Sequence, residues 1–122
     1  MNGERNGKCK EYDNWSGKLI FDGEYLNGKK NGKCKEYYND DLIFEGEYLN
    51  GEKNGKCKEY YYGEKLTFEG EYLNGKKNGK GIEYYENGEV RFEGEYLNGK
   101  RHGKFEGYND GDELRFEGEY LN

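Results

Sequence analysis

Two short strings recur at a nearly constant period along the 122-residue chain, and this repeat limits the possible folds more than any other feature. One string, F-(E/D)-G-E-Y-L-N, begins at positions 23, 24, 24 and 24 residues apart: Phe21, Phe44, Phe68, Phe92 and Phe116. The other, N-G-x-x-(N/H)-G-K, begins at Asn2, Asn27, Asn50, Asn74 and Asn98. A period of about 20 to 50 residues is typical of repeat proteins whose units pack only on their neighbours. The sequence therefore predicts one array over residues 1–122, with repeat units beginning near those five phenylalanines and an incomplete first unit.

Within each copy the side chains alternate with a period of two, which is the pattern of a half-buried β-strand. In the third copy, one face of the strand carries Leu66, Phe68, Gly70 and Tyr72, and the other carries Thr67, Glu69, Glu71 and Leu73. A second short strand spans residues 80–85, and residues 74–79 between the strands are dense in Asn and Gly, which favour hairpin turns. We therefore expect an all-β fold, an elongated single-layer antiparallel β-meander of about five tandem β-hairpin repeats of 23–24 residues each.

The composition excludes an ordinary aliphatic core. The formal net charge is −6, and the large aliphatic residues are scarce, which alone would suggest disorder, but the chain also has 14 Tyr and 6 Phe. A single-layer sheet has no second layer to cover its face, so large rings must lie over positions on the next strand that glycine leaves empty. The expected glycine positions are Gly23, Gly46, Gly70, Gly94 and Gly118.

A register follows if the hairpin turn is centred between Lys53 and Asn54. The opposite pairs are then Tyr48–Cys57, Gly46–Glu59 and Phe44–Tyr61 on one face, and Glu47–Lys58 and Glu24–Lys35 on the other. This register places the phenylalanines, the tyrosines and a column of glutamates on one inner face. The cross-strand ion pairs on the other face would contribute about 0.2–1 kcal/mol each.

The residues that carry chemistry are too few for an enzyme. There is one Ser, one Thr and one His, and the paired glutamates repeat in equivalent, solvated positions, whereas acid–base catalysis needs carboxylates in different environments. Cys9, Cys34 and Cys57 recur at one place in successive copies, about 9–10 Å apart, which is too far for a disulfide or a shared metal. We therefore expect no catalytic residues, no cofactor and no metal, and small buried thiols in a reducing, cytoplasmic setting.

The segment from Phe68 to Gly81, F-E-G-E-Y-L-N-G-K-K-N-G-K-G, resembles the MORN (membrane occupation and recognition nexus) repeat, and residues 92–104 nearly repeat it. The resemblance covers essentially the whole chain and implies an elongated, twisted antiparallel sheet with a groove on one face. MORN repeats are appended to lipid kinases, junctophilins and a histone methyltransferase, and they also form scaffolds. The chain departs from the family where the second Gly of G-x-G is replaced by Cys9, Cys34, Cys57 and Phe105, and only Gly81 matches.

Two classes of function remain. The first is a scaffold or protein-interaction module that binds a basic peptide or helix along an aromatic and glutamate-lined groove. Its expected binding residues are Phe44, Phe68, Phe92, Tyr48, Tyr72, Tyr96, Glu36, Glu59 and Glu83.

The alternative is peripheral binding to anionic phospholipid through cations of the hairpin turns, namely Lys29, Lys30, Lys76, Lys77, Lys100 and Arg101. The negative net charge favours the protein partner over the membrane and argues against nucleic acid. The first and last strands leave open edges, which invite weak end-to-end association between copies. The family resemblance also implies association through the ends.

Overall fold

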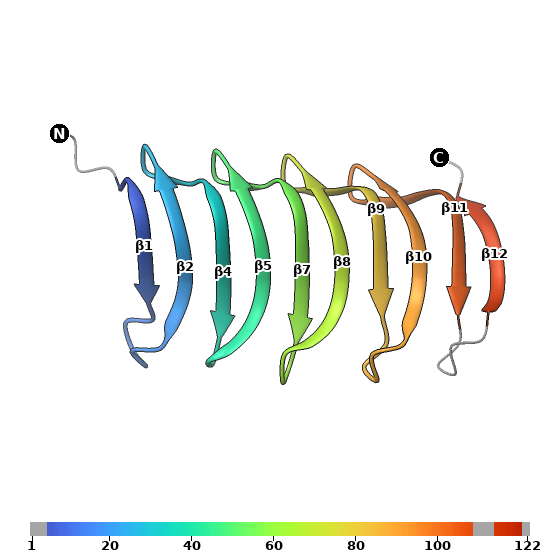
Figure 1. Cartoon of the computed structure of the whole chain (residues 1–122), viewed down its shortest axis with the longest axis horizontal. Coiled ribbons are helices and arrows are strands. Elements are labelled where there is room, and N and C mark those ends of the chain that lie inside the picture. Colours follow the sequence, from blue (N-terminus) through green and yellow to red (C-terminus); the bar gives the residue numbers. More distant parts are fainter. Residues whose placement is uncertain (1–4, 109–113, 121–122) are drawn as a thin grey trace.

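The structure, a computed structural model, describes residues 5–108 and 114–120, with side chains of the last segment described at residues 117–119. All of its regular elements are strands of one open antiparallel sheet (Figure 1). The strands are β1 (Gly7–Tyr12), β2 (Leu19–Leu26), β3 (Lys29–Lys30), β4 (Gly32–Tyr38), β5 (Asp41–Leu49), β6 (Glu52–Lys53), β7 (Gly55–Tyr61), β8 (Lys65–Leu73), β9 (Lys76–Tyr84), β10 (Val90–Leu97), β11 (Lys100–Tyr108) and β12 (Leu114–Tyr120). The described part of the chain contains no helix long and apolar enough to cross a membrane.

The strands lie side by side in sequence order, which confirms the predicted single-layer meander (Figure 1). The order across the sheet is β1-β2-β4-β5-β7-β8-β9-β10-β11-β12, while β3 pairs with β2 and β6 pairs with β5. In the third and fourth hairpins the strand that follows the turn is continuous, as in β9. In the first and second hairpins this strand is split into a two-residue piece and a longer one. Each unit therefore packs only on the units before and after it, as expected for a repeat array.

The N-G dipeptides at residues 27–28, 50–51, 74–75 and 98–99 form two-residue hairpin turns. Asn50 and Gly51 have φ angles of 50° and 84°, and they lie between the directly paired Leu49 and Glu52. Positive φ at both central positions defines a turn whose twist matches that of the flanking strands, and Asn-Gly adopts it at low cost. The connections at the opposite edge vary in length, because Tyr38 pairs with Asp41 across two residues and Tyr61 with Lys65 across three.

The predicted register is wrong by two residues. Phe44 lies opposite Glu59 rather than Tyr61, and Glu45 rather than Glu47 lies opposite Lys58. Likewise Asp22, not Glu24, is the partner of Lys35. The turn closes at Asn50–Gly51, well before the predicted centre, and the following Asn-Gly pair forms an irregularity in the returning strand, where Gly55 has φ 98°. Because a slip of two keeps every side chain on its face, the predicted faces are correct although the predicted partners are not.

Rings over glycine form the core, but the glycine lies mainly on the ring's own strand rather than on the next strand, where the sequence predicts it. Phe21, Phe44, Phe68 and Phe92 are only 2–3% exposed, and each ring lies over the glycine two residues later. A Cβ added at Gly46, for example, would lie 2.9 Å from Cζ of Phe44 and 2.7 Å from Cβ of Cys57. The tyrosine two residues further on packs edge-on against the same ring, as Tyr48 does against Phe44 at 6.0 Å between centroids.

The residues that replace the second family glycine belong to this core. Cys34 and Cys57 are buried, as predicted, while Cys9 on the edge strand is half-buried. Phe105 stacks on Phe92 at 5.6 Å and fills the space beside Gly94 and Gly118. The departures from the family pattern are therefore accommodated as packing between neighbouring units.

Candidate binding surfaces

One side of the sheet, here called the aromatic face, carries the phenylalanines, the tyrosines and the glutamates that the sequence assigned to a single face. The backbone partners of Phe44 and Phe68 include Glu59, which lies between them on β7, and Glu83 follows on β9. Phenylalanine and glutamate therefore alternate from strand to strand in one row. The nine predicted partner-binding residues are brought together on this face.

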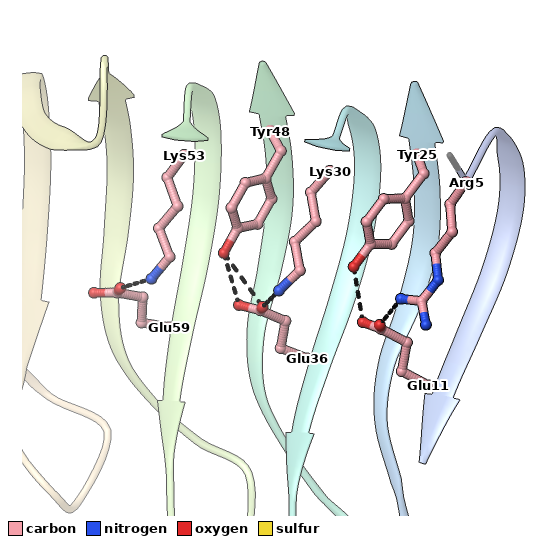
Figure 2. A network of polar contacts seen from close by, with 8 residues as sticks. All are labelled: Arg5, Glu11, Tyr25, Lys30, Glu36, Tyr48, Lys53 and Glu59. Atoms are coloured by element: carbon pink, nitrogen blue, oxygen red, sulfur yellow. Dashed lines mark hydrogen bonds and ion pairs between the residues drawn. The ribbon is translucent and has the colours of Figure 1, made fainter. Parts of the chain in front are cut away.

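The glutamates of the aromatic face already have partners within the protein (Figure 2). The Tyr48 hydroxyl donates to Glu36 at 3.2 Å, and Nζ of Lys30 lies 3.1 Å from the same carboxylate. Glu59 accepts a hydrogen bond from the Tyr72 hydroxyl at 2.9 Å and pairs with Lys53 at 3.6 Å. The same arrangement recurs at the ends of the array, where Arg5 and Tyr25 bind Glu11, and Arg101 and Tyr96 bind Glu83.

The cations of this network also cover the phenylalanine rings. Nζ of Lys53 lies 4.3 Å from the centroid of Phe44, and Nζ of Lys77 lies 4.1 Å from that of Phe68. Lys30 and Arg101 cover the remaining two buried rings, Phe21 and Phe92. A cation over a ring is attracted by about 0.5–1 kcal/mol where it is exposed and by more where it is desolvated. Each of these long side chains thus closes the face by contacting a ring and a carboxylate together.

The hydroxyls of Tyr48 and Tyr72 on the aromatic face are held in their neutral form. Burial raises the pKa of Tyr48 and Tyr72, and the neighbouring carboxylates, Glu36 and Glu59, raise it further. A neutral hydroxyl can donate to a carboxylate, whereas a phenolate would repel it. A partner on this face would reach the half-buried tyrosines and the cations, because the phenylalanines lie beneath them. Binding by the nine predicted residues stays a prediction.

The other side of the sheet, here called the charged face, carries lysines and acidic residues in alternation. Along one row Lys33 lies opposite Glu47 and Lys56 opposite Glu71, and along the next Glu45 lies between Lys35 and Lys58. The Nζ–carboxylate distances in that second row reach 4.0 Å, and about half of each lysine side chain is exposed. These charges are therefore solvated and weakly coupled, as is usual for surface ion pairs.

A groove of about 880 Å³ runs across the charged face from β1 to β9. Its floor is the backbone of a row of glycines and cysteines, and the cysteine side chains lie on the opposite, aromatic face. Its walls contain six lysines and six carboxylates, namely Lys8, Lys33, Lys35, Lys56, Lys58 and Lys80 with Asp22, Glu24, Glu45, Glu47, Glu69 and Glu71. The groove is therefore polar and balanced in charge.

The charge balance is lost toward the C-terminal strands. Ile82 and Glu106 occupy positions where earlier units have lysine, so that Glu93 lies between Ile82 and Glu106. Glu106 in turn lies opposite Glu117 on β12. Three carboxylates in directly opposite positions give this end of the charged face a negative potential. Like charges that face each other repel, so this arrangement by itself destabilises the sheet.

The six predicted lipid-binding cations divide into two groups. Lys30, Lys77 and Arg101 lie back over the aromatic face, whereas Lys29, Lys76 and Lys100 are exposed at the turn edge. The exposed group lies beside a row of leucines that sequence reasoning did not single out. These leucines are Leu26, Leu49, Leu73 and Leu97, each 40–51% exposed. Their signal in the sequence is the E-Y-L-N string, which recurs where β2, β5, β8 and β10 run into the hairpin turns.

The contacts between the cations and the glutamates of the aromatic face were not predicted from the sequence, although the sequence contains a signal for them. A basic residue precedes each of these glutamates by six positions, as in Lys30 and Glu36 or Lys53 and Glu59. In the part of the chain that the structure describes, no cluster of three or more His, Cys, Asp or Glu side chains could hold a metal ion.

An open array of β-hairpins with one closed aromatic face and one solvated charged face defines a repeat scaffold. A family model described as the MORN repeat matches residues 21–42, 44–63, 68–90 and 92–104, which together make up more than half of the chain. The chain therefore belongs to the MORN repeat family. A search of curated proteins finds no relative that matches. MORN repeats occur in protein-interaction and membrane-association modules, and the family is one of scaffolds rather than enzymes.

Proposed function

We propose that this protein is a non-catalytic scaffold that binds a protein segment of net positive charge along the charged face. The observation that carries the proposal is the groove of about 880 Å³ on that face, because its polar side chains are solvated and accessible. A partner lying along the groove would replace the weak, solvated ion pairs of this face by ion pairs between the protein and the partner. Breaking exposed ion pairs costs little free energy.

The preference for a basic partner comes from the C-terminal strands. The groove itself is balanced, but its continuation over β10, β11 and β12 presents Glu93, Glu106 and Glu117 in opposite positions. Complementary charge increases the rate of encounter and selects the orientation of a partner. A segment with its basic end over these strands would be bound in one direction.

The aromatic and glutamate-lined face, expected from the sequence to bind the partner, is the competing surface. Its carboxylates are 18–24% exposed and already contact tyrosine hydroxyls and lysines, so a basic partner would have to displace Lys53 from Glu59 or Lys30 from Glu36. The free energy lost by breaking an existing ion pair offsets the free energy gained from the new ion pair with the partner. Binding on the charged face is therefore favoured over binding on the aromatic face.

A defined probe tests the proposal. We expect a fluorescein-labelled peptide of alternating Lys and Ser to bind in an anisotropy assay, its Glu and Ser counterpart not to bind, and added salt to weaken binding. Glu93→Gln together with Glu106→Gln should lower the affinity at least about threefold, since two charge contacts are lost. The matched control, Glu59→Gln together with Glu83→Gln, removes the same charge from the aromatic face and should leave the affinity unchanged once folding is verified by thermal unfolding.

The reverse outcome, with binding lost only in the Glu59 and Glu83 pair, would move the partner to the aromatic face. Equal binding of both peptides, or no effect of either pair, would overturn a charge-selected protein partner. The expected cytoplasmic setting remains part of the proposal and is supported by the thiols of Cys34 and Cys57, which are free and buried.

Membrane association is the second candidate, and the turn edge is the observation that favours it. Lys29, Lys76 and Lys100 lie there beside the half-exposed leucine row. Lysines near anionic lipid contribute about 1 kcal/mol each, and partly inserted leucines would add to this. Co-sedimentation with vesicles containing phosphatidylserine would support this candidate if it is lost in Lys76→Gln together with Lys100→Gln and kept in Lys77→Gln.

A further inference from the structure

A row of tyrosines borders the groove on the charged face. Tyr37 lines the groove itself. The Tyr60 hydroxyl donates to Glu45 at 3.3 Å, and the Tyr84 hydroxyl donates to Glu69 at 2.9 Å. Both carboxylates line the groove. The three tyrosines therefore lie on the charged face, at the ends of their strands that are far from the N-G turns.

Isoleucines on the intervening strands add to this border. Ile20 on β2 and Ile43 on β5 precede the buried Phe21 and Phe44, so their side chains point to the opposite face, which is the charged one. They are 41% and 38% exposed. The groove thus has an apolar border beside its charged walls, and exposed apolar surface rimmed by polar residues is typical of a binding site.

The tyrosines recur with the period of the sheet. Tyr37, Tyr60 and Tyr84 occupy equivalent places on β4, β7 and β9, and each of these strands is two strands away from the next. Neighbouring strands lie about 4.8 Å apart, so successive tyrosines are separated by about 9.6 Å along the groove. A polyproline II helix makes one turn in three residues and advances about 9.3 Å. Every third residue of such a segment would therefore meet an equivalent tyrosine.

Other backbone conformations match this spacing less well. In a β-strand, residues on one side follow each other at about 6.6 Å, and residues three apart point to opposite sides. In an α-helix, the seven residues that return to one side span about 10.5 Å, about 0.9 Å more than the spacing of the tyrosines. The polyproline II repeat differs from that spacing by only about 0.3 Å, so the row of tyrosines fits this conformation best.

We propose that the partner on the charged face is a proline-rich segment in the polyproline II conformation, with a lysine or arginine in each triplet. The proposal rests on the function proposed above and names the class of partner for that site. Prolines would pack on the tyrosine rings, which is how aromatic-lined grooves bind such segments. The basic residue of each triplet would reach the carboxylate beside a ring, such as Glu45 beside Tyr60 or Glu69 beside Tyr84.

These carboxylates are able to accept a second partner. A carboxylate has room for several hydrogen bonds, so Glu45 and Glu69 can keep their tyrosine hydroxyls while they bind a basic residue. The lysines nearest to them, Lys35 and Lys58, lie at 4.0 Å and are about half exposed, so little is lost when they move away. A proline-rich segment also loses little conformational freedom on binding, because it is already in the bound conformation.

Two fluorescein-labelled peptides of equal length and charge test the conformation of the partner. One consists of four Pro-Pro-Lys triplets and is about 37 Å long, and the other consists of four Ser-Ser-Lys triplets. Both should bind in an anisotropy assay through their lysines, but the proline peptide should bind at least about fivefold more tightly. Equal binding of the two would overturn this inference and leave the proposed function standing, whereas binding of neither would overturn both.

Paired variants locate the site. Tyr37→Leu together with Tyr60→Leu removes two rings and should reduce the preference for the proline peptide to less than about twofold, whereas the corresponding Phe pair keeps the rings and should retain it. The matched control is Tyr38→Leu together with Tyr61→Leu, on the next residues of the same strands, whose side chains point to the aromatic face. This control should leave the preference unchanged, with folding of every variant verified by thermal unfolding. A preference that survives in the Tyr37 and Tyr60 Leu pair, or that is lost equally in the control, would overturn the proposal.

Discussion

Replacing Gly46 by alanine tests whether the phenylalanine rings need the space over the glycine row. Gly46 lies in the middle of β5, where its backbone is ordinary extended strand, so alanine introduces no conformational strain there. The added methyl group would instead lie 2.7 Å from Cβ of Cys57, 2.9 Å from Cζ of Phe44 and 3.2 Å from Cα of Cys57. All three contacts are shorter than ordinary van der Waals distances, and one of them involves backbone.

The size of the expected loss in the free energy of unfolding depends on which group moves to make room for the methyl group. Phe44 is 2% exposed, and turning its ring out to solvent would cost about 2–3 kcal/mol of burial. Shifting β5 against β7 instead is overpacking, which costs about 1–3 kcal/mol. The alanine also restricts the unfolded chain, which offsets about 0.4–1 kcal/mol. We therefore expect Gly46→Ala to lower the free energy of unfolding by about 1–2 kcal/mol.

Urea unfolding followed by far-ultraviolet circular dichroism measures this change as a lower midpoint at unchanged slope. Phe44→Leu removes the ring atom nearest to the added methyl, so Gly46→Ala should cost less in that background than in the native one. Gly63→Ala is the control, because Gly63 has open space around it and a φ of 72°; its cost is backbone strain alone and should not depend on Phe44. A native or higher midpoint for Gly46→Ala, or the same loss with and without Phe44→Leu, would refute the ring-over-glycine account.

Two further predictions concern titrating groups in the core. Burial raises the pKa of the Cys34 and Cys57 thiols to about 12, so iodoacetamide at pH 8.5 should label both at least about a hundredfold more slowly in the folded protein than in urea, with mass spectrometry as the readout. The pKa of Tyr48 and Tyr72 is raised above that of an unfolded tyrosine, about 10, so the contribution of these two tyrosines to stability should be constant below pH 10 and fall as the pH rises above it. The fall, measured as urea midpoint against pH, should be smaller in Tyr48→Phe together with Tyr72→Phe, and an equal fall would place the titrating groups elsewhere.

The class of fold and the two faces of the sheet can be predicted from the sequence. The alternation of Phe, Gly and Tyr with acidic residues is a local property of an extended chain, because neighbouring side chains must point to opposite sides. The N-G pairs likewise mark turns through the φ angles that they accept, as Asn50 and Gly51 do. The glycine row was predictable because a single layer has no other way to bury its rings.

The residues that meet across the strands, in contrast, depend on how the whole sheet folds. Each unit contains two N-G pairs, and either could form the hairpin turn. In the structure the turn forms at Asn50–Gly51, while Gly55 lies at an irregularity of the returning strand. That choice sets the register, and the register brings Glu59 between Phe44 and Phe68, within reach of Lys53 and Tyr72. The same register places Glu93 beside Glu106 and makes one end of the charged face acidic. Faces follow from the backbone's local geometry, whereas partners depend on hydrogen bonds between strands, and these form only when the whole hairpin closes.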